Sequence, residues 1–169
     1  MKEIVGKCLR GIDWLSEWTG KIIAFLIPGL ALIEGYEIVA RYAFKSPTVW
    51  VHELCAMLFG TFILLGGAYT LLQGGHVNMD ILYNRFSTRT RAVLDLITFF
   101  IFLAFIGVLL WKGWESAWRS IKFLEHDSTE WGPPLYPFKI MLPLGALLIL
   151  LQGIAQFVRN FITVLRGDG

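Results

Sequence analysis

Residues 22–44 read IIAFLIPGLALIEGYEIVARYAF, and this stretch decides the fold class because it is mainly apolar over a length that crosses a bilayer. A transmembrane helix needs about 20 predominantly apolar residues. Three further runs, 54–73, 93–111 and 135–158, have a similar length and composition. We therefore expect an all-α integral membrane protein, a four-helix bundle whose single membrane domain uses residues 1–169.

The composition excludes a soluble globule and gives no sign of a nucleic-acid partner. Hydrophobic residues make up 56% and aromatic residues 15% of the chain, and the mean hydropathy is +0.60, so too little polar surface is available to cover a soluble core. The formal net charge is only +2, and the basic residues flank apolar runs, where lipid headgroups act on them. The lipid bilayer is the first expected partner.

The residues before the first apolar run have an amphipathic pattern. Apolar side chains recur at helical spacing at Ile4, Cys8, Ile12 and Leu15. With Trp14 and Trp18, which suit the headgroup zone, this pattern predicts an interfacial helix that lies flat on the membrane before the chain enters the bilayer at Ile22. The alternative, a helical extension of the first span, has equal support.

The distribution of Lys and Arg predicts the side of the membrane on which each loop lies. With four spans, both termini and the middle loop share one side, which holds nine of the 15 Lys and Arg residues, whereas the other side holds six. Cytoplasmic loops retain an excess of these residues. We therefore expect both termini in the cytoplasm.

The first run contains three ionisable side chains in one sector of a helical face: Glu34, Glu37 and Arg41. An ionised group at the centre of a span costs on the order of 3 kcal/mol, so these carboxylates need compensation. Arg41 can pair with Glu37, whereas Glu34 needs another polar partner or a retained proton. The favoured interpretation is a polar contact with another helix or subunit, and the alternative is proton or cation coupling.

Four polar or aromatic residues near the second run are further candidates for structural or interface contacts. Trp50 is expected to anchor at the membrane interface. Glu53 falls in the early turns of the second helix, where the helix dipole favours a negative charge. His76 and Asp80 follow the run and have two open interpretations, polar contacts between helices or contacts with a partner.

The segment 112–137 predicts a second amphipathic helix, on or just above the outer leaflet. Its aromatic stripe comprises Trp111, Trp114, Trp118 and Ile121. The acidic residues Glu125, Asp127 and Glu130 follow this stripe and could meet a basic patch on a soluble partner, because charges at the rim of an interface tune encounter rates.

Enzymatic, metal and cofactor chemistry find no support in the sequence. His52, His76 and His126 all lie in or beside loops, so paired haem ligands within the spans are not expected. No set of three or four residues has a metal-ligand spacing, and no serine or cysteine has a recognisable base beside it. We expect no catalytic residues, no metal site, no cofactor and no enzymatic activity.

Several short motifs occur in an order that resembles a known family, the DctQ-like small membrane subunit of tripartite ATP-independent periplasmic (TRAP) transporters. The motifs are Arg41-Tyr42, Trp50 with Glu53, Gly75-His76 followed by Asp80, the basic run Arg85 to Arg91, and Leu142-Pro143-Leu144-Gly145. The resemblance covers nearly the whole chain. Asn78 departs from it, because the family often has a basic residue at this position.

The resemblance implies a scaffold subunit of a secondary transporter in a bacterial inner membrane. In that family a large membrane subunit carries the substrate and sodium sites, and a periplasmic substrate-binding protein captures an organic acid. Glu34, Glu37 and Arg41 then become candidates for pairing between or within subunits. The alternative is a self-sufficient small ion-coupled carrier that uses Glu34 and Glu37.

Overall fold

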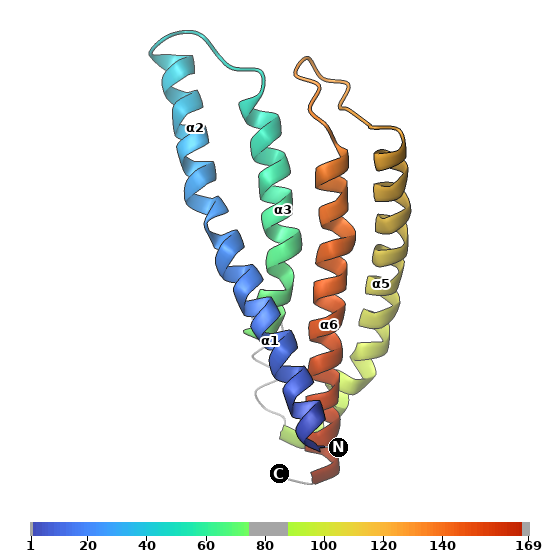
Figure 1. Ribbon diagram of the computed structural model, residues 1–169. Coiled ribbons are helices and arrows are strands. Elements are labelled where there is room, and N and C mark those ends of the chain that lie inside the picture. Colours follow the sequence, from blue (N-terminus) through green and yellow to red (C-terminus); the bar gives the residue numbers. More distant parts are fainter. Residues whose placement is uncertain (1, 75–87, 167–169) are drawn as a thin grey trace.

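The computed structural model describes residues 2–74 and 88–166, and these residues are almost entirely helical (Figure 1). The helices are α1 (Lys2–Ala24), α2 (Leu26–Tyr42), α3 (Val51–Leu72), α5 (Thr88–Lys122) and α6 (Tyr136–Arg166). An isolated bridge between His126 and Pro134 is the β-type pairing recorded in this part of the chain. The all-α prediction is confirmed.

Four segments are long and apolar enough to cross a membrane, as the sequence predicts. They are Gly6–Tyr42, Val51–Leu72, Ile97–Lys122 and Tyr136–Ile162. Two loops, 43–50 and 123–135, lie at one end of the molecule, here called the loop end. The start of α1 and the end of α6 lie at the opposite end, here called the terminal end (Figure 1).

The four spans predicted to form a helix bundle lie side by side in the order α1/α2, α3, α6, α5, as an open row (Figure 1). Within the described residues, α5 packs extensively on α6 alone, and α6 packs on α3. The first helices pack mainly on α3, and α1 also reaches α6. Away from the terminal end, where α1 crosses onto α3 and α6, this arrangement leaves the broad faces of the row open to lipid or to another protein (Figure 1).

Glycine allows α6 to pack on both sides. A Cβ atom added to Gly145 would come 2.5 Å from the Leu64 carbonyl oxygen of α3, so only glycine permits this close approach. On the other side, the missing Cβ of Gly153 leaves room for the Phe102 ring of α5. The motif around Pro143 and Gly145 therefore contributes to helix packing, as small residues commonly do in membranes.

Helix α1 belongs to a candidate membrane span and is not clearly the interfacial helix predicted from the sequence. A one-residue interruption at Phe25 separates α1 from α2, three residues before Pro28, which cannot donate a helical hydrogen bond. The two helices run almost end to end (Figure 1). Ser16 is buried, and Gly20 packs closely against the Tyr69 ring of α3. The structure thus favours the alternative prediction, a helical extension of the span.

The helical extension is longer than a bilayer core. Gly6–Tyr42 contains 37 residues, which is about 55 Å of helix against a hydrocarbon thickness of about 30 Å. If Arg41 marks one boundary, the other falls near Lys21, whose ammonium pairs with Glu17 at 2.6 Å in an exposed position. The earlier turns of α1 therefore project beyond the core, and exposed Trp14 and Trp18 lie on them.

The third span is longer than predicted, and the expected amphipathic helix after it does not exist as a separate element. Helix α5 continues without a break to Lys122. Its buried stripe comprises Ile106, Gly113, Ala117 and Ser120. The small residues Gly113, Ala117 and Ser120 pack the last turns of α5 onto α6, and Gly113 lies against Leu142. The aromatic stripe around Trp114 therefore lies on the side of a spanning helix.

Candidate functional site

Glu37 is the best-satisfied carboxylate near the loop end, although the residue is only 6% exposed. Its Oε1 accepts hydrogen bonds from Arg41 Nε at 3.0 Å and Nη2 at 2.6 Å. Its Oε2 accepts from the Thr48 backbone N–H at 3.1 Å and the Thr48 hydroxyl at 2.5 Å. The side chain therefore neutralises its charge within the chain and ties loop 43–50 to α2.

Glu34 lies one turn before Glu37 and has a very different environment. Glu34 is exposed on α2. Its carboxylate lies beside the thiol of Cys55, a buried residue of α3. None of the ion pairs found among the described residues involves Glu34. A thiol is a weak hydrogen-bond donor and brings no counter-charge.

The predicted interface residues Trp50 and Glu53 join the two loops at the loop end. The Trp50 ring lies between Tyr36 and Trp131, with ring centroids 6.2 Å and 6.5 Å away. Glu53 Oε2 accepts a hydrogen bond of 2.8 Å from the Thr129 hydroxyl. The head of α3 is thus connected to α2 and to the loop before α6.

The three acidic residues predicted to form a partner-binding patch have unequal roles in this loop. Glu125 pairs with Lys139 at 2.6 Å, and this contact, with the Ser120 hydroxyl, holds the pKa of the Glu125 carboxyl below its usual value despite some desolvation. The Asp127 backbone N–H donates to the Pro133 carbonyl at 2.9 Å. Glu130 is exposed. Glu125 therefore has a structural role within this chain.

A polar network near the terminal end was missed by the sequence analysis. The Ser16 hydroxyl donates to Gln152 Oε1 at 2.9 Å, and Gln152 Nε2 donates to Asp13 Oδ1 at 3.2 Å. Arg159 pairs with the same Asp13. Gln152 is 0% and Ser16 is 1% exposed. The available signal was the pair of amides Gln152 and Gln156 in the apolar run 135–158, because an amide in a membrane span needs a polar partner.

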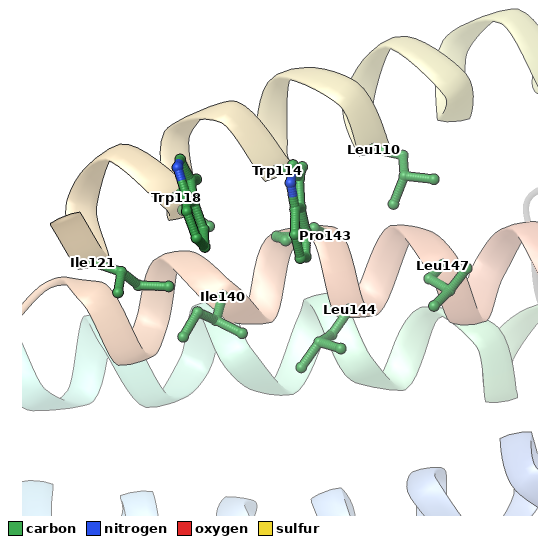
Figure 2. Close-up of a pocket in the computed structure, with 9 residues that line it drawn as sticks. Leu110, Trp114, Trp118, Ile121, Ile140, Pro143, Leu144 and Leu147 are labelled. Carbon is green, nitrogen blue, oxygen red and sulfur yellow. The ribbon is translucent and has the colours of Figure 1, made fainter.

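The loop end of α5 and α6 carries two different grooves. One is apolar, and Figure 2 shows Trp114 and Trp118 of α5 directed toward Ile140 and Pro143 of α6. The other is polar and is lined by Lys112, Glu115, Ser116, Arg119, Glu125 and Lys139. Ion pairs link Glu115 to Lys112 at 2.8 Å and to Arg119 at 3.1 Å.

The described histidines, His52 and His126, lie near the loop end. His52 is exposed, and His126 Nδ1 lies 2.7 Å from the Leu124 carbonyl oxygen. His76 and Asp80 lie outside the described residues. Among residues 2–74 and 88–166, no group of three or more His, Cys, Asp or Glu side chains could hold a metal ion.

The amino-acid sequence of this four-span chain matches a known protein family. The family model described as "Tripartite ATP-independent periplasmic transporters, DctQ component" matches residues 30–163. The chain belongs to this family. It is therefore a multi-pass membrane component of a TRAP transporter and not an enzyme. The match covers α2, α3, α5 and α6 and begins after Asp13 and Ser16.

Individual relatives of this DctQ-family chain are distant. It is 28% identical over 105 residues to the C4-dicarboxylate TRAP transporter small permease protein DctQ of Vibrio cholerae, covering 57% of this chain and 45% of the relative. It is 26% identical over 98 residues to the sialic acid TRAP transporter small permease protein SiaQ of the same species, covering 58% and 57%. The chain thus spans about half the length of these two relatives.

A third relative is much longer than this chain. The sialic acid TRAP transporter permease protein SiaT of Haemophilus influenzae is 27% identical over 160 residues, which is 92% of this chain but only 24% of SiaT. A segment like the whole DctQ-family chain is therefore part of a larger permease polypeptide in that protein.

Proposed function

We propose that this chain is the scaffold subunit of a TRAP transporter that takes up an organic acid, driven by sodium. Its expected partners are a large membrane subunit and a periplasmic substrate-binding protein. The names of the relatives favour a carboxylate substrate, since one is a C4-dicarboxylate and two are sialic acid transporter proteins. SiaT supports the large partner, because three quarters of its length has no counterpart in this chain.

The observation that carries the scaffold role is the position of the buried polar groups. In the described residues these are Ser16, Glu37, Ser120 and Gln152. Ser16 and Glu37 are separated by about 30 Å along α1 and α2, which is close to the thickness of the hydrocarbon core. The two polar layers therefore lie about one core thickness apart, and the described residues between them supply no buried polar path for a charged substrate.

The orientation of the subunit is part of the proposal. We place the terminal end in the cytoplasm, because that side of the sequence carries the larger share of Lys and Arg. The loop end then faces the periplasm, where the binding protein is expected. Asp127 and Glu130 are the acidic residues of this loop that we expect to contact the binding protein, because Glu125 already pairs with Lys139 within the chain. Neutralising Asp127 and Glu130 together would then weaken docking most at low salt.

Affinity purification tests the partner relationship. A tag on this chain, in mild detergent and from the native host, is expected to recover a large multispanning protein that mass spectrometry identifies as the TRAP large subunit. A control tag on an unrelated four-span protein of the same membrane should not recover it. Recovery of the small chain alone, under conditions that preserve other membrane complexes, contradicts the scaffold role.

A further inference from the structure

Helix α2 has two stripes with opposite surroundings. One stripe faces α3 and comprises Leu26, Leu30, Ile33, Glu37 and Ala40, the last two of which are buried. The other, here called the outward stripe, comprises Ile27, Ala31, Glu34, Gly35, Ile38 and Tyr42. Their spacing of three and four residues places them on one side of the helix. No other helix in the described residues packs extensively on this part of α2 beyond α3 and the end of α1.

Glu34 is the one charged residue of the outward stripe, and it lies at the edge of that stripe, where its carboxylate is also beside the Cys55 thiol of α3. The thiol brings no counter-charge, and lipid at this depth offers none. Along the helix Glu34 is about 10 Å from Arg41 and about 20 Å from Lys21. Both basic residues pair with other carboxylates, Arg41 with Glu37 and Lys21 with Glu17. An ionisable side chain in a membrane span normally pairs with another group or faces a protein interior.

The stripe around Glu34 is also shaped for close approach. A Cβ atom added to Gly35 would meet nothing within 4 Å in this chain. Ala31 and Gly35 are four residues apart, a spacing of small residues that permits membrane helices to approach closely. Packing within the described chain therefore gives no reason for a glycine at this surface position.

We infer that the outward stripe of α2 is the surface on which the large permease subunit docks, with a Lys or Arg side chain of that subunit paired to Glu34. The inference rests on the proposed function, because the partner is the large subunit of the same transporter. Charge complementarity selects this occupant, since acyl chains can cover Ile27 and Ile38 but cannot neutralise a carboxylate.

The test compares variants of this chain co-expressed with its large subunit, using the molar ratio of large to tagged small subunit after purification. Glu34→Leu and Gly35→Leu are each expected to lower this ratio by about three- to tenfold, the range that single polar contacts between membrane helices support. Glu34→Gln is expected to have a smaller effect because it retains hydrogen-bonding groups.

Gly107→Leu is the matched control. Gly107 lies on α5 at the far end of the row, and a Cβ atom there also meets nothing within 4 Å, so the wild-type ratio is expected. Membrane yield and gel-filtration profile of each small subunit expressed alone exclude misfolding, and Glu34→Leu should be at least as abundant as wild type. A wild-type ratio for Glu34→Leu, or an equal loss for Gly107→Leu, overturns the docking surface.

Three further outcomes separate this inference from the alternatives. A wild-type chain that recovers no large subunit contradicts the proposed function itself, whatever the variants do. An intact Glu34→Leu complex that has lost uptake contradicts docking and points to coupling chemistry at Glu34. Intact complex and intact uptake in Glu34→Leu exclude both roles for this carboxylate.

Discussion

At the scale of single residues, a carboxylate in a membrane helix is stable when enough donors reach its oxygens. Glu37 receives four hydrogen bonds from Arg41 and Thr48, so its role is explained within the chain. Glu34, one turn away, has the Cys55 thiol beside it and forms none of the ion pairs found among the described residues. The difference comes from loop 43–50, which folds back over Glu37 and does not reach Glu34.

Replacing Gln152 tests how much the polar network with Ser16 and Asp13 contributes to stability. Gln152→Leu leaves the buried Ser16 hydroxyl without its acceptor and removes the contact with Asp13. We expect the free energy of unfolding to fall by about 1–3 kcal/mol, the cost of an unsatisfied buried polar group. Denaturation of the purified chain in detergent measures it.

Gln156→Leu is the control for that substitution. Gln156 lies one turn further along α6 and is only half-buried, so its replacement should cost clearly less. Equal stability of Gln152→Leu and wild type would show that the polar network contributes nothing to the fold.

At the scale of the helices, α6 is central because its glycines allow two neighbours to pack closely. Gly145→Ala forces a Cβ atom against the Leu64 backbone of α3, and overpacking of this kind costs about 1–3 kcal/mol. Gly66→Ala is the matched variant on α3, because its added Cβ meets nothing within 4 Å. It should stabilise the helix by up to about 1 kcal/mol. Thermal unfolding of both variants measures the contrast, and equal behaviour contradicts the packing described.

The ion pair between Glu125 and Lys139 is expected to make the stability of the loop before α6 depend on pH. The pKa of Glu125 is lowered from its usual 4.5, chiefly by Lys139, so its ion pair stabilises the loop above that value and is lost as the pH falls below it. The stability advantage of the wild-type chain over Glu125→Gln should therefore begin to fall as the pH drops below 4.5 and should vanish only below the lowered pKa of Glu125. An advantage that persists at low pH contradicts a contribution from the ionised pair.

Sequence reasoning located the spans well but not their packing. Apolar length alone predicts four spans, and i,i+4 spacing predicts the Glu37–Arg41 contact that the structure contains. The end of α5 was placed too early because Lys112 and Glu115 look like an interface, whereas buried Gly113 and Ala117 continue the helix contact. The network around Gln152 needs tertiary structure, because its partners on α1 are 136 or more residues away.

At the scale of the whole molecule, an open row is a suitable shape for a subunit that braces another membrane protein. The broad faces are accessible away from the terminal end, where α1 packs on α3 and α6. The loops at the other end are tied together through Trp50 and Glu53. Such a shape has little interior, so the transport path is expected in the partner.

Reporter fusions test the orientation. A fluorescent protein fused after Gly169 should be fluorescent, and alkaline phosphatase at the same position should be inactive, because both report a cytoplasmic terminus. Phosphatase inserted after Ser128, in the loop between α5 and α6, should be active. The reverse pattern contradicts the proposed sidedness and, with it, the periplasmic position of Asp127 and Glu130.

The central claim is that this DctQ-family chain is required for transport but has no substrate path of its own. Its most direct test is sodium-driven uptake of candidate organic acids into proteoliposomes containing this chain, the large subunit and the binding protein, with each omitted in turn. We predict uptake only when all three are present. Uptake by liposomes that contain this chain alone would contradict the account and assign the coupling chemistry to Glu34 and Glu37.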